Sequence, residues 1–67
     1  MGAVMMIRVW LSDIRLDVGM THEEVAKSVG VKRQYYSMIE NGDRTPSVKV
    51  ARKIGEVLNF NWTIFFE

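Results

Sequence analysis

The segment from residue 21 to residue 46 limits what this chain can fold into more than any other part of it. Thr21 and Glu24 form a capping box, in which each side chain accepts a hydrogen bond from the other residue's backbone N–H. The box predicts a helix that begins at His22. Gly30 ends this helix, because glycine adopts the left-handed conformation without the steric cost of a Cβ atom. The chain therefore turns sharply after one short helix.

A second short helix is predicted over residues 33–40, directly after that turn. Tyr36 and Ile39 are three residues apart, so they face one side of the helix and are expected to be buried. Asn41-Gly42 ends the helix, and the single proline of the chain follows and prevents its continuation. Two short helices joined by a tight glycine turn form a helix-turn-helix.

The outer side of this second helix carries side chains that can read DNA bases. Arg33 and Gln34 stand on its first turn, which is the part of a recognition helix that reaches base edges, and Met38 stands one turn later. Arginine bonds bidentately to guanine, glutamine bonds to adenine, and an apolar side chain can contact a thymine methyl group. We predict these three as base-reading residues. The alternatives are a solvated charge at Arg33 and a partly buried Met38.

Further side chains near this helix are candidates for contacts with DNA phosphates, and they are His22, Lys32, Tyr35, Asn41 and Arg44. His22 stands at the first position of its helix, where the helix dipole favours an anion. The turn over residues 41–46 exposes backbone N–H groups beside Asn41 and Arg44. The alternatives are an exposed histidine beside the cap and a solvated lysine at position 32.

The charge distribution favours a few phosphate contacts rather than a strongly basic binding surface. The formal net charge is only +1. Residues 1–30 carry three basic and four acidic side chains, while residues 31–67 carry six and four. The basic excess thus begins at the second helix of the motif. We expect an affinity for DNA that falls with salt less steeply than that of a basic tail.

The run from Thr21 to Ser47 resembles the DNA-binding domain shared by phage repressors, Cro proteins and XRE-type bacterial regulators. The matching features are the capped helix at Thr21, Val25-Ala26, Gly30-Val31, Ser37, Ile39-Glu40-Asn41-Gly42, Arg44 and Pro46-Ser47. The resemblance covers about residues 10–66. It implies an all-α, compact five-helix domain like that of lambda repressor, acting as a stand-alone transcriptional regulator, most simply a repressor. Lys32 departs from the family's usual Ser or Thr, and Tyr36 from its usual aliphatic residue.

The resemblance also implies one structural ion pair. Arg15 lies where the family carries an arginine on its first helix, and its partner there is the residue that corresponds to Glu40. Such a pair ties the first helix to the end of the recognition helix. The alternative is a solvated Arg15.

The rest of the sequence predicts one domain over residues 10–67, preceded by an apolar N-terminal arm over residues 1–9 that is expected to fray at its start. Ser47 caps a helix that runs to about Leu58, and Asn61 caps a last helix over the sequence WTIFF. Gly55 inside the first of these indicates a close helix contact. The buried stripe expected of a helix from near Trp10 comprises Leu11, Ile14 and Val18.

Surplus apolar residues at the C-terminus predict a homodimer. Trp62 and Phe65 are three apart and can face the core, whereas Ile64 points away from that face. Together with Phe66 and the N-terminal arm, Ile64 would form a patch of the kind that marks a partner site, packed on its own copy. The alternative is a lone exposed isoleucine, which is common on protein surfaces.

The composition gives little support to an enzyme or a metal protein. There is no cysteine and only one histidine, so neither a disulfide, a thiolate metal site nor a histidine pair is available. We expect no catalysis, no cofactor, no metal and no small-molecule ligand. The apolar N-terminal stretch is interrupted by Arg8 and too short to span a bilayer. It also lacks a signal-peptide cleavage site, which indicates a cytoplasmic location.

A different class of function keeps the same fold without DNA. The modest net charge and the apolar C-terminus are also compatible with a protein-interaction module, such as an antitoxin-like partner. A positive strip over the two helices of the motif distinguishes the DNA-binding alternative from this one.

Overall fold

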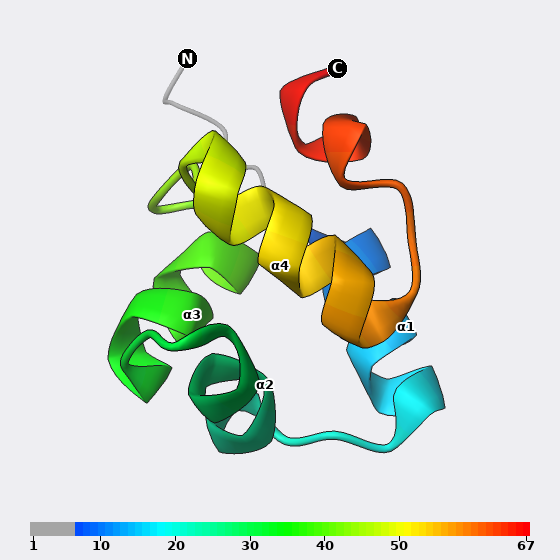
Figure 1. Ribbon diagram of the computed structural model, residues 1–67, viewed down its shortest axis with the longest axis vertical. Coiled ribbons are helices and arrows are strands. Elements are labelled where there is room, and N and C mark those ends of the chain that lie inside the picture. The colour runs from blue at the N-terminus through cyan, green and yellow to red at the C-terminus, as the bar shows by residue number, and fades with distance from the viewer. Residues whose placement is uncertain (1–6) are drawn as a thin grey trace, which may run out of the picture.

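A computed structural model describes residues 7–67 of the chain, and it contains four α-helices followed by a 3-10 helix (Figure 1). Their bounds are Val9–Val18 for α1, His22–Val29 for α2, Arg33–Asn41 for α3, Val48–Leu58 for α4 and Trp62–Phe66 for η1. The prediction of an all-α domain is confirmed, although the last of the five expected helices is of the 3-10 type. No helix in the described part of the chain is long and apolar enough to cross a membrane.

The capping residues set the first and last residues of the helices where the sequence predicts them. The Thr21 hydroxyl accepts from the Glu24 N–H at 3.1 Å, and the Thr21 N–H donates to the Glu24 carboxylate at 2.8 Å. Gly30 ends α2 with a φ of +81°, which the missing Cβ atom permits. Ser47 caps α4 through the Val50 N–H at 3.2 Å. These local bonds fix the length of each helix before any packing is considered.

The core lies between α4 and the pair formed by α2 and α3, with α1 behind α4 in the view of Figure 1. Val25, Ala26 and Val29 enter it from α2, and α3 contributes Tyr36 and Ile39. The buried residues of α4 are Ala51, Ile54, Gly55 and Leu58. Tyr36 and Ile39, which the sequence predicts to be buried, thus both lie in the core.

On α1 the predicted stripe is partly wrong. Leu11 is fully buried and Ile14 half-buried, but Val18 is 49% exposed. The helix ends at Val18 and the chain turns away at Gly19, so no element packs over that position. Arg15 is buried on this helix instead, because its guanidinium group faces Glu40.

Gly55 makes close contact with the chain that follows its own helix, including Trp62 at the start of η1. A Cβ atom at this position would lie 2.7 Å from the Phe60 carbonyl oxygen and 3.1 Å from the Trp62 Cβ atom. The Phe60 N–H also donates to the Gly55 carbonyl at 2.9 Å. The glycine therefore allows η1 to fold back against α4.

Two residues of the expected N-terminal arm, Arg8 and Val9, belong to or contact the helices. Val9 is the first residue of α1, and the Arg8 N–H donates to the Glu40 carbonyl at 2.8 Å. Arg8 and Val9 are thus packed with the helices, although they belong to the expected arm. Residues 1–6 of the arm lie outside the described residues.

Candidate nucleic-acid interface

The outer side of α3 presents a continuous row of side chains to solvent. Gln34, Met38 and Asn41 follow one another at spacings of four and three along one face of the helix. Gln34 and Asn41 are exposed and Met38 is half-buried, while Arg33 is exposed beside the start of the row. Two of the three predicted base-reading residues, Gln34 and Met38, therefore share one face of α3, and Arg33 lies beside the start of that face.

Three of the predicted phosphate contacts lie at or near the two ends of α3, and a fourth lies against the core. Lys32 and Arg44 are exposed at the two ends of α3, and Asn41 is its last residue rather than part of the following turn. Lys32 occupies the N-cap position without any side-chain cap bond, because an ammonium group has no acceptor to offer the backbone N–H groups. Tyr35 is half-buried and packs against the core cluster.

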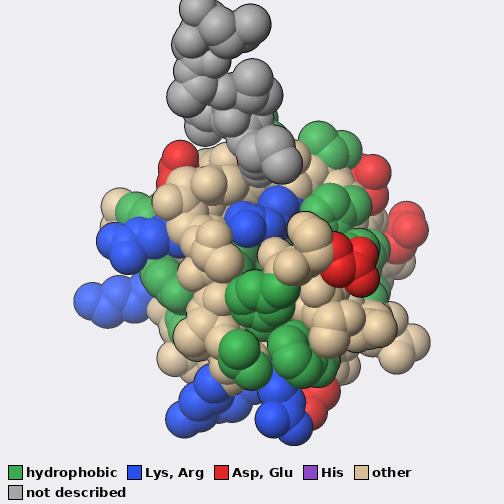
Figure 2. All heavy atoms as spheres, turned by 90° about the horizontal axis from the view of Figure 1, so that it is seen from above, with side chains coloured by type: hydrophobic (Ala, Val, Ile, Leu, Met, Phe, Trp, Pro, Cys, Tyr) green, Lys and Arg blue, Asp and Glu red, His purple; other side chains and the backbone are tan. Residues whose placement is uncertain are grey.

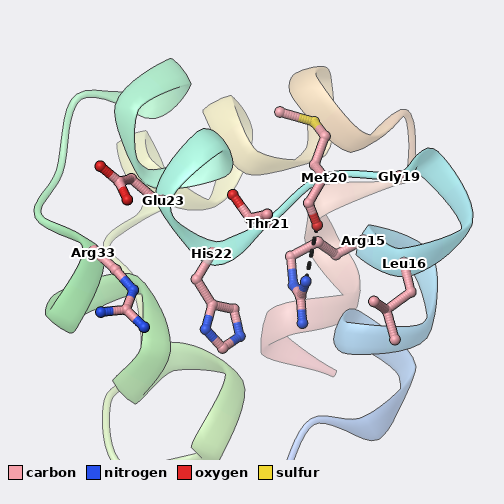
Figure 3. A pocket seen from close by; sticks show the side chains of 8 residues that line it. All are labelled: Arg15, Leu16, Gly19, Met20, Thr21, His22, Glu23 and Arg33. Carbon is pink, nitrogen blue, oxygen red and sulfur yellow. Dashed lines mark hydrogen bonds between the residues drawn. The ribbon is translucent and has the colours of Figure 1, made fainter.

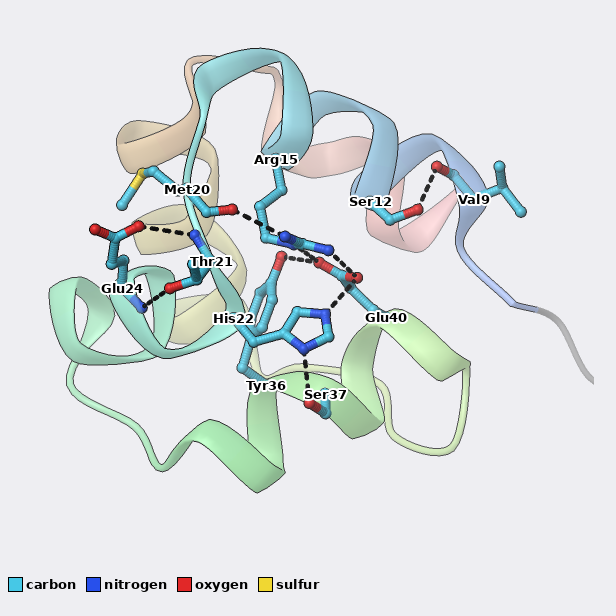
Figure 4. Close-up of polar contacts among 10 residues, drawn as sticks. All are labelled: Val9, Ser12, Arg15, Met20, Thr21, His22, Glu24, Tyr36, Ser37 and Glu40. Atoms are coloured by element: carbon cyan, nitrogen blue, oxygen red, sulfur yellow. Dashed lines mark hydrogen bonds and ion pairs between the residues drawn. The ribbon is translucent and has the colours of Figure 1, made fainter.

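His22 is turned toward α3 rather than toward solvent (Figure 4). Its Nε2 atom lies 3.1 Å from Glu40 Oε1, and its Nδ1 atom lies 3.3 Å from Ser37 Oγ. The side chain is 32% exposed. A phosphate at the start of α2 would compete with both contacts for the ring nitrogens.

A pocket beside the start of α2 brings together three side chains that carry nitrogen groups. Arg15, His22 and Arg33 all line it, together with the acidic Glu23 (Figure 3). The side chain of Arg33 lies next to that of His22 in this view, and Arg15 lies on the other side of the histidine. Cationic or polar nitrogen groups thus cluster where the N-terminus of α2 meets α3.

The buried carboxylate of Glu40 connects the helices of the motif through hydrogen bonds. The Arg15 Nε atom donates to Glu40 Oε2 at 2.6 Å, which is the pair that the resemblance implies. The Tyr36 hydroxyl donates to the same oxygen at 2.6 Å, and a second guanidinium nitrogen of Arg15 donates to the Met20 carbonyl at 2.8 Å. Together these bonds connect α1, the chain before α2, and α3.

Ionisation of the network follows from these contacts. Burial alone would raise the pKa of Glu40, but hydrogen bonds from Arg15, Tyr36 and His22 outweigh it and lower that pKa. The hydrogen bond to Glu40 raises the pKa of Arg15, and burial raises that of Tyr36. At neutral pH the centre is therefore a carboxylate held by a cation and a neutral phenol, with no buried polar side-chain atom in the described residues left unbonded.

Sequence reasoning missed two parts of this arrangement. The Tyr36 hydroxyl bonds to Glu40, and the i,i+4 spacing of the two residues is the sequence signal that could have identified this partner. Nothing local indicated that His22 would bind Glu40, because the two residues lie on different helices.

Exposed charges over α2 and α3 are mixed rather than uniformly positive. Lys32, Arg33 and Arg44 are exposed around α3, whereas Glu23 and Asp43 are exposed close to them. The positive groups gather at the two ends of α3. These residues do not form an extended strip of positive charge along both helices.

Four α-helices around one core, with α2 and α3 joined by a glycine turn and α3 open along its outer side, define a small helix-turn-helix domain. The chain belongs to the Helix-turn-helix family, whose model matches residues 11–65. The family resemblance predicted from the sequence is thereby confirmed.

Relatives with similar sequences carry the same description. The chain is 61% identical to an uncharacterized HTH-type transcriptional regulator, YqaF, of Bacillus subtilis over 62 residues, covering 92% of this chain and 82% of the relative. It is 42% identical over 53 residues to an uncharacterized HTH-type transcriptional regulator of Archaeoglobus fulgidus, covering 79% and 76%. The solved N-terminal DNA-binding domain of SinR from Bacillus subtilis matches with a TM-score of 0.78 at 28% identity, covering 92% of this chain and 91% of that one.

Proposed function

We propose that this chain is a transcriptional regulator that binds a specific sequence of duplex DNA by placing α3 in the major groove. The observation that carries this is the row of Gln34, Met38 and Asn41 along the open side of α3, with Arg33 exposed at its start. The helix is held rigidly by the buried Glu40 network, and a rigid support is what precise base reading requires. The exposed charges over α2 and α3 do not form the continuous positive strip expected of a DNA-binding surface. The choice of DNA over a protein partner therefore rests on the family and its regulator relatives.

Base reading is assigned to the first two turns of α3. Arg33 and Gln34 bond to purine edges in this proposal, and Met38 contacts a thymine methyl group. Because Met38 is half-buried, its contribution is limited to apolar contact and close fit. Sequence discrimination therefore rests mainly on the first turn.

Phosphate contacts are assigned to both ends of the helix. Lys32 and Arg44 supply exposed cations there, and Asn41 supplies an amide. Tyr35 can donate through its hydroxyl while its ring packs against the core. For His22 to bind phosphate, its ring must exchange the contacts with Glu40 and Ser37 for the anion.

We further propose that the regulator acts as a homodimer through an apolar terminal patch, defined as Ile7, Val9, Ile64 and Phe66. These four side chains are between 40% and 58% exposed. Three of them, Ile7, Val9 and Ile64, line one groove. Figure 2 shows this end of the molecule, where hydrophobic side chains lie next to one another between separate basic and acidic groups. Dimerisation would present two recognition helices to half-sites about 34 Å apart.

Repression is the simplest regulatory outcome, because a bound dimer that covers a promoter excludes the polymerase without a further contact. Such a protein would work in the cytoplasm, where bacterial and archaeal DNA lies. Its role would be binding and not catalysis.

Selection from a pool of random duplexes tests the proposal. Wild type should enrich one motif, and a variant carrying both Arg33→Ala and Gln34→Ala should lose enrichment at the positions that those residues read. Lys53→Ala, on the exposed side of α4, is the matched control and should recover the wild-type motif. If wild type enriches no sequence, the protein-interaction alternative replaces this function.

A further inference from the structure

The C-terminal end of α3 is bonded by a residue that is distant from it in sequence. The last carbonyl groups of a helix have no partner within the helix, and a cation near them is favourable. No basic residue stands in the last turn of α3. The chain after α3 bonds to some of these carbonyl groups, since the Gly42 N–H donates to the Ile39 carbonyl at 3.2 Å.

Arg8 supplies the missing cation from the N-terminal segment. Its Nη1 atom donates to the Ile39 carbonyl at 2.6 Å, and its backbone N–H donates to the Glu40 carbonyl at 2.8 Å. Two successive carbonyl groups at the end of the recognition helix are therefore bonded by one residue that is 31 positions away in sequence from Ile39.

The same guanidinium nitrogen also reaches the turn that follows α3. Arg8 Nη1 donates to the Arg44 carbonyl at 3.0 Å. The Arg44 N–H donates to the Met38 carbonyl at 3.3 Å. The backbone of Arg44 is thus bonded on both sides, once to α3 and once to Arg8, while its side chain is exposed.

Packing holds the Arg8 side chain in this position. Its guanidinium carbon lies 5.6 Å from the centre of the Phe65 ring, within the range of a cation–π contact. Arg8 is half-buried, and this burial lowers the pKa of its guanidinium group from its ordinary value. A charge is withdrawn from water only where bonds replace its hydration, and here the carbonyl groups of Ile39 and Arg44 provide them.

We propose that Arg8 is a positioning residue for DNA binding, because it fixes the turn over residues 42–45 and thereby aims the Arg44 side chain at a phosphate. This rests on the proposed function, in which Arg44 is a phosphate contact. Arg8 itself touches no DNA in the proposal. It acts through the backbone of Ile39 and Arg44.

A pair of substitutions separates charge from geometry. Arg8→Met keeps an apolar stem against Phe65 but removes every side-chain bond to the carbonyl groups. Arg8→Lys keeps the charge, yet a single ammonium group lacks the planar fork of arginine. For a random-sequence duplex at low salt, Arg8→Met should lower affinity about five- to tenfold, on the order of one phosphate contact, with Arg8→Lys in between.

A double-mutant cycle with Arg44→Ala shows whether Arg8 acts through Arg44. In the Arg44→Ala background, Arg8→Met should change affinity by less than about twofold, because the contact that Arg8 positions is already absent. An equal loss in both backgrounds would show that Arg8 acts independently and would overturn the proposal. Thermal unfolding of each variant verifies that binding is measured on folded protein.

Amide hydrogen exchange of residues 43 and 44 provides a readout that needs no DNA. Arg8→Met should speed exchange at these amides more than at those of α2, and Arg8→Lys should partly restore protection. Unchanged exchange in the turn, with lower stability of the whole domain, would reduce Arg8 to a purely structural residue. If wild type binds no duplex while exchange responds as expected, the proposed function fails and the positioning of the turn stands.

Discussion

Arg33 is the residue whose change tests base reading most directly. It is exposed on the first turn of α3 and has no ion-pair partner among residues 7–67. Its removal should therefore leave the fold intact. We predict that Arg33→Ala costs about 1–3 kcal/mol on the selected sequence and relaxes preference at one base pair. Competition binding against duplexes changed at each position measures this. An equal loss on random duplex would make Arg33 a phosphate contact instead.

Arg15 and Glu40 form the residue-scale contact on which the motif depends most. They are 9% and 5% exposed, so removing one partner leaves the other charge largely out of water. We predict that Arg15→Met destabilises the domain by up to about 3–5 kcal/mol without changing the selected DNA motif. Chemical denaturation provides the first measurement and the duplex selection provides the second. A variant as stable as wild type would contradict the prediction.

Acid should remove this stabilisation. The folded-state pKa of Glu40 lies below the ordinary value of 4.5, so its contribution is complete above that value and is lost as pH falls through the folded-state pKa. The stability difference between wild type and Arg15→Met should accordingly narrow below about pH 4.5. His22→Gln controls for the histidine on the same carboxylate. A difference that stays constant into strong acid would show that Glu40 does not carry the effect.

At the scale of the elements, α4 and η1 approach each other closely at Gly55. Alanine is a better helix former than glycine by about 1 kcal/mol, so Gly55→Ala would stabilise α4 if space allowed. Its Cβ atom would lie 2.7 Å from the Phe60 carbonyl oxygen, which is backbone and cannot swing aside. We predict that the clash prevails and that Gly55→Ala costs about 1–3 kcal/mol. Glu56→Ala, exposed on the same helix, is the control, and a more stable Gly55→Ala protein would contradict the packing described.

At the scale of the whole molecule, the four side chains of the terminal patch are exposed. A charge placed in that patch should prevent self-association, because burying an unpaired carboxylate is costly. We predict that wild type sediments as a dimer and that Ile64→Glu sediments as a monomer with unchanged helix content. Val48→Glu, at an exposed valine outside the patch, should remain dimeric. Wild type that sediments as a monomer at high micromolar concentration without DNA would limit the dimer to the operator.

Local signals in the sequence determine the elements of this protein. The capping box at Thr21, the glycine at position 30 and the serine at position 47 act on backbone groups within a few residues, so their effects can be read without knowing the fold. The inward faces of α2, α3 and α4 are also predictable, because helical periodicity places them on one side. Only η1 departs in type, since its five residues are too few to establish a period.

Tertiary structure alone decides which polar groups from distant parts of the chain meet. Arg8 reaches carbonyl groups of α3 and the turn after it, and His22 bonds to Glu40 across two helices. Such partners depend on how the helices cross and on which polar atoms burial leaves without water, and no short-range pattern encodes either. Val18 illustrates the same limit, because its exposure follows from the absence of an overlying element rather than from its place in the helical period. Thus periodicity and capping determine where each helix lies, whereas packing determines how the recognition helix is held.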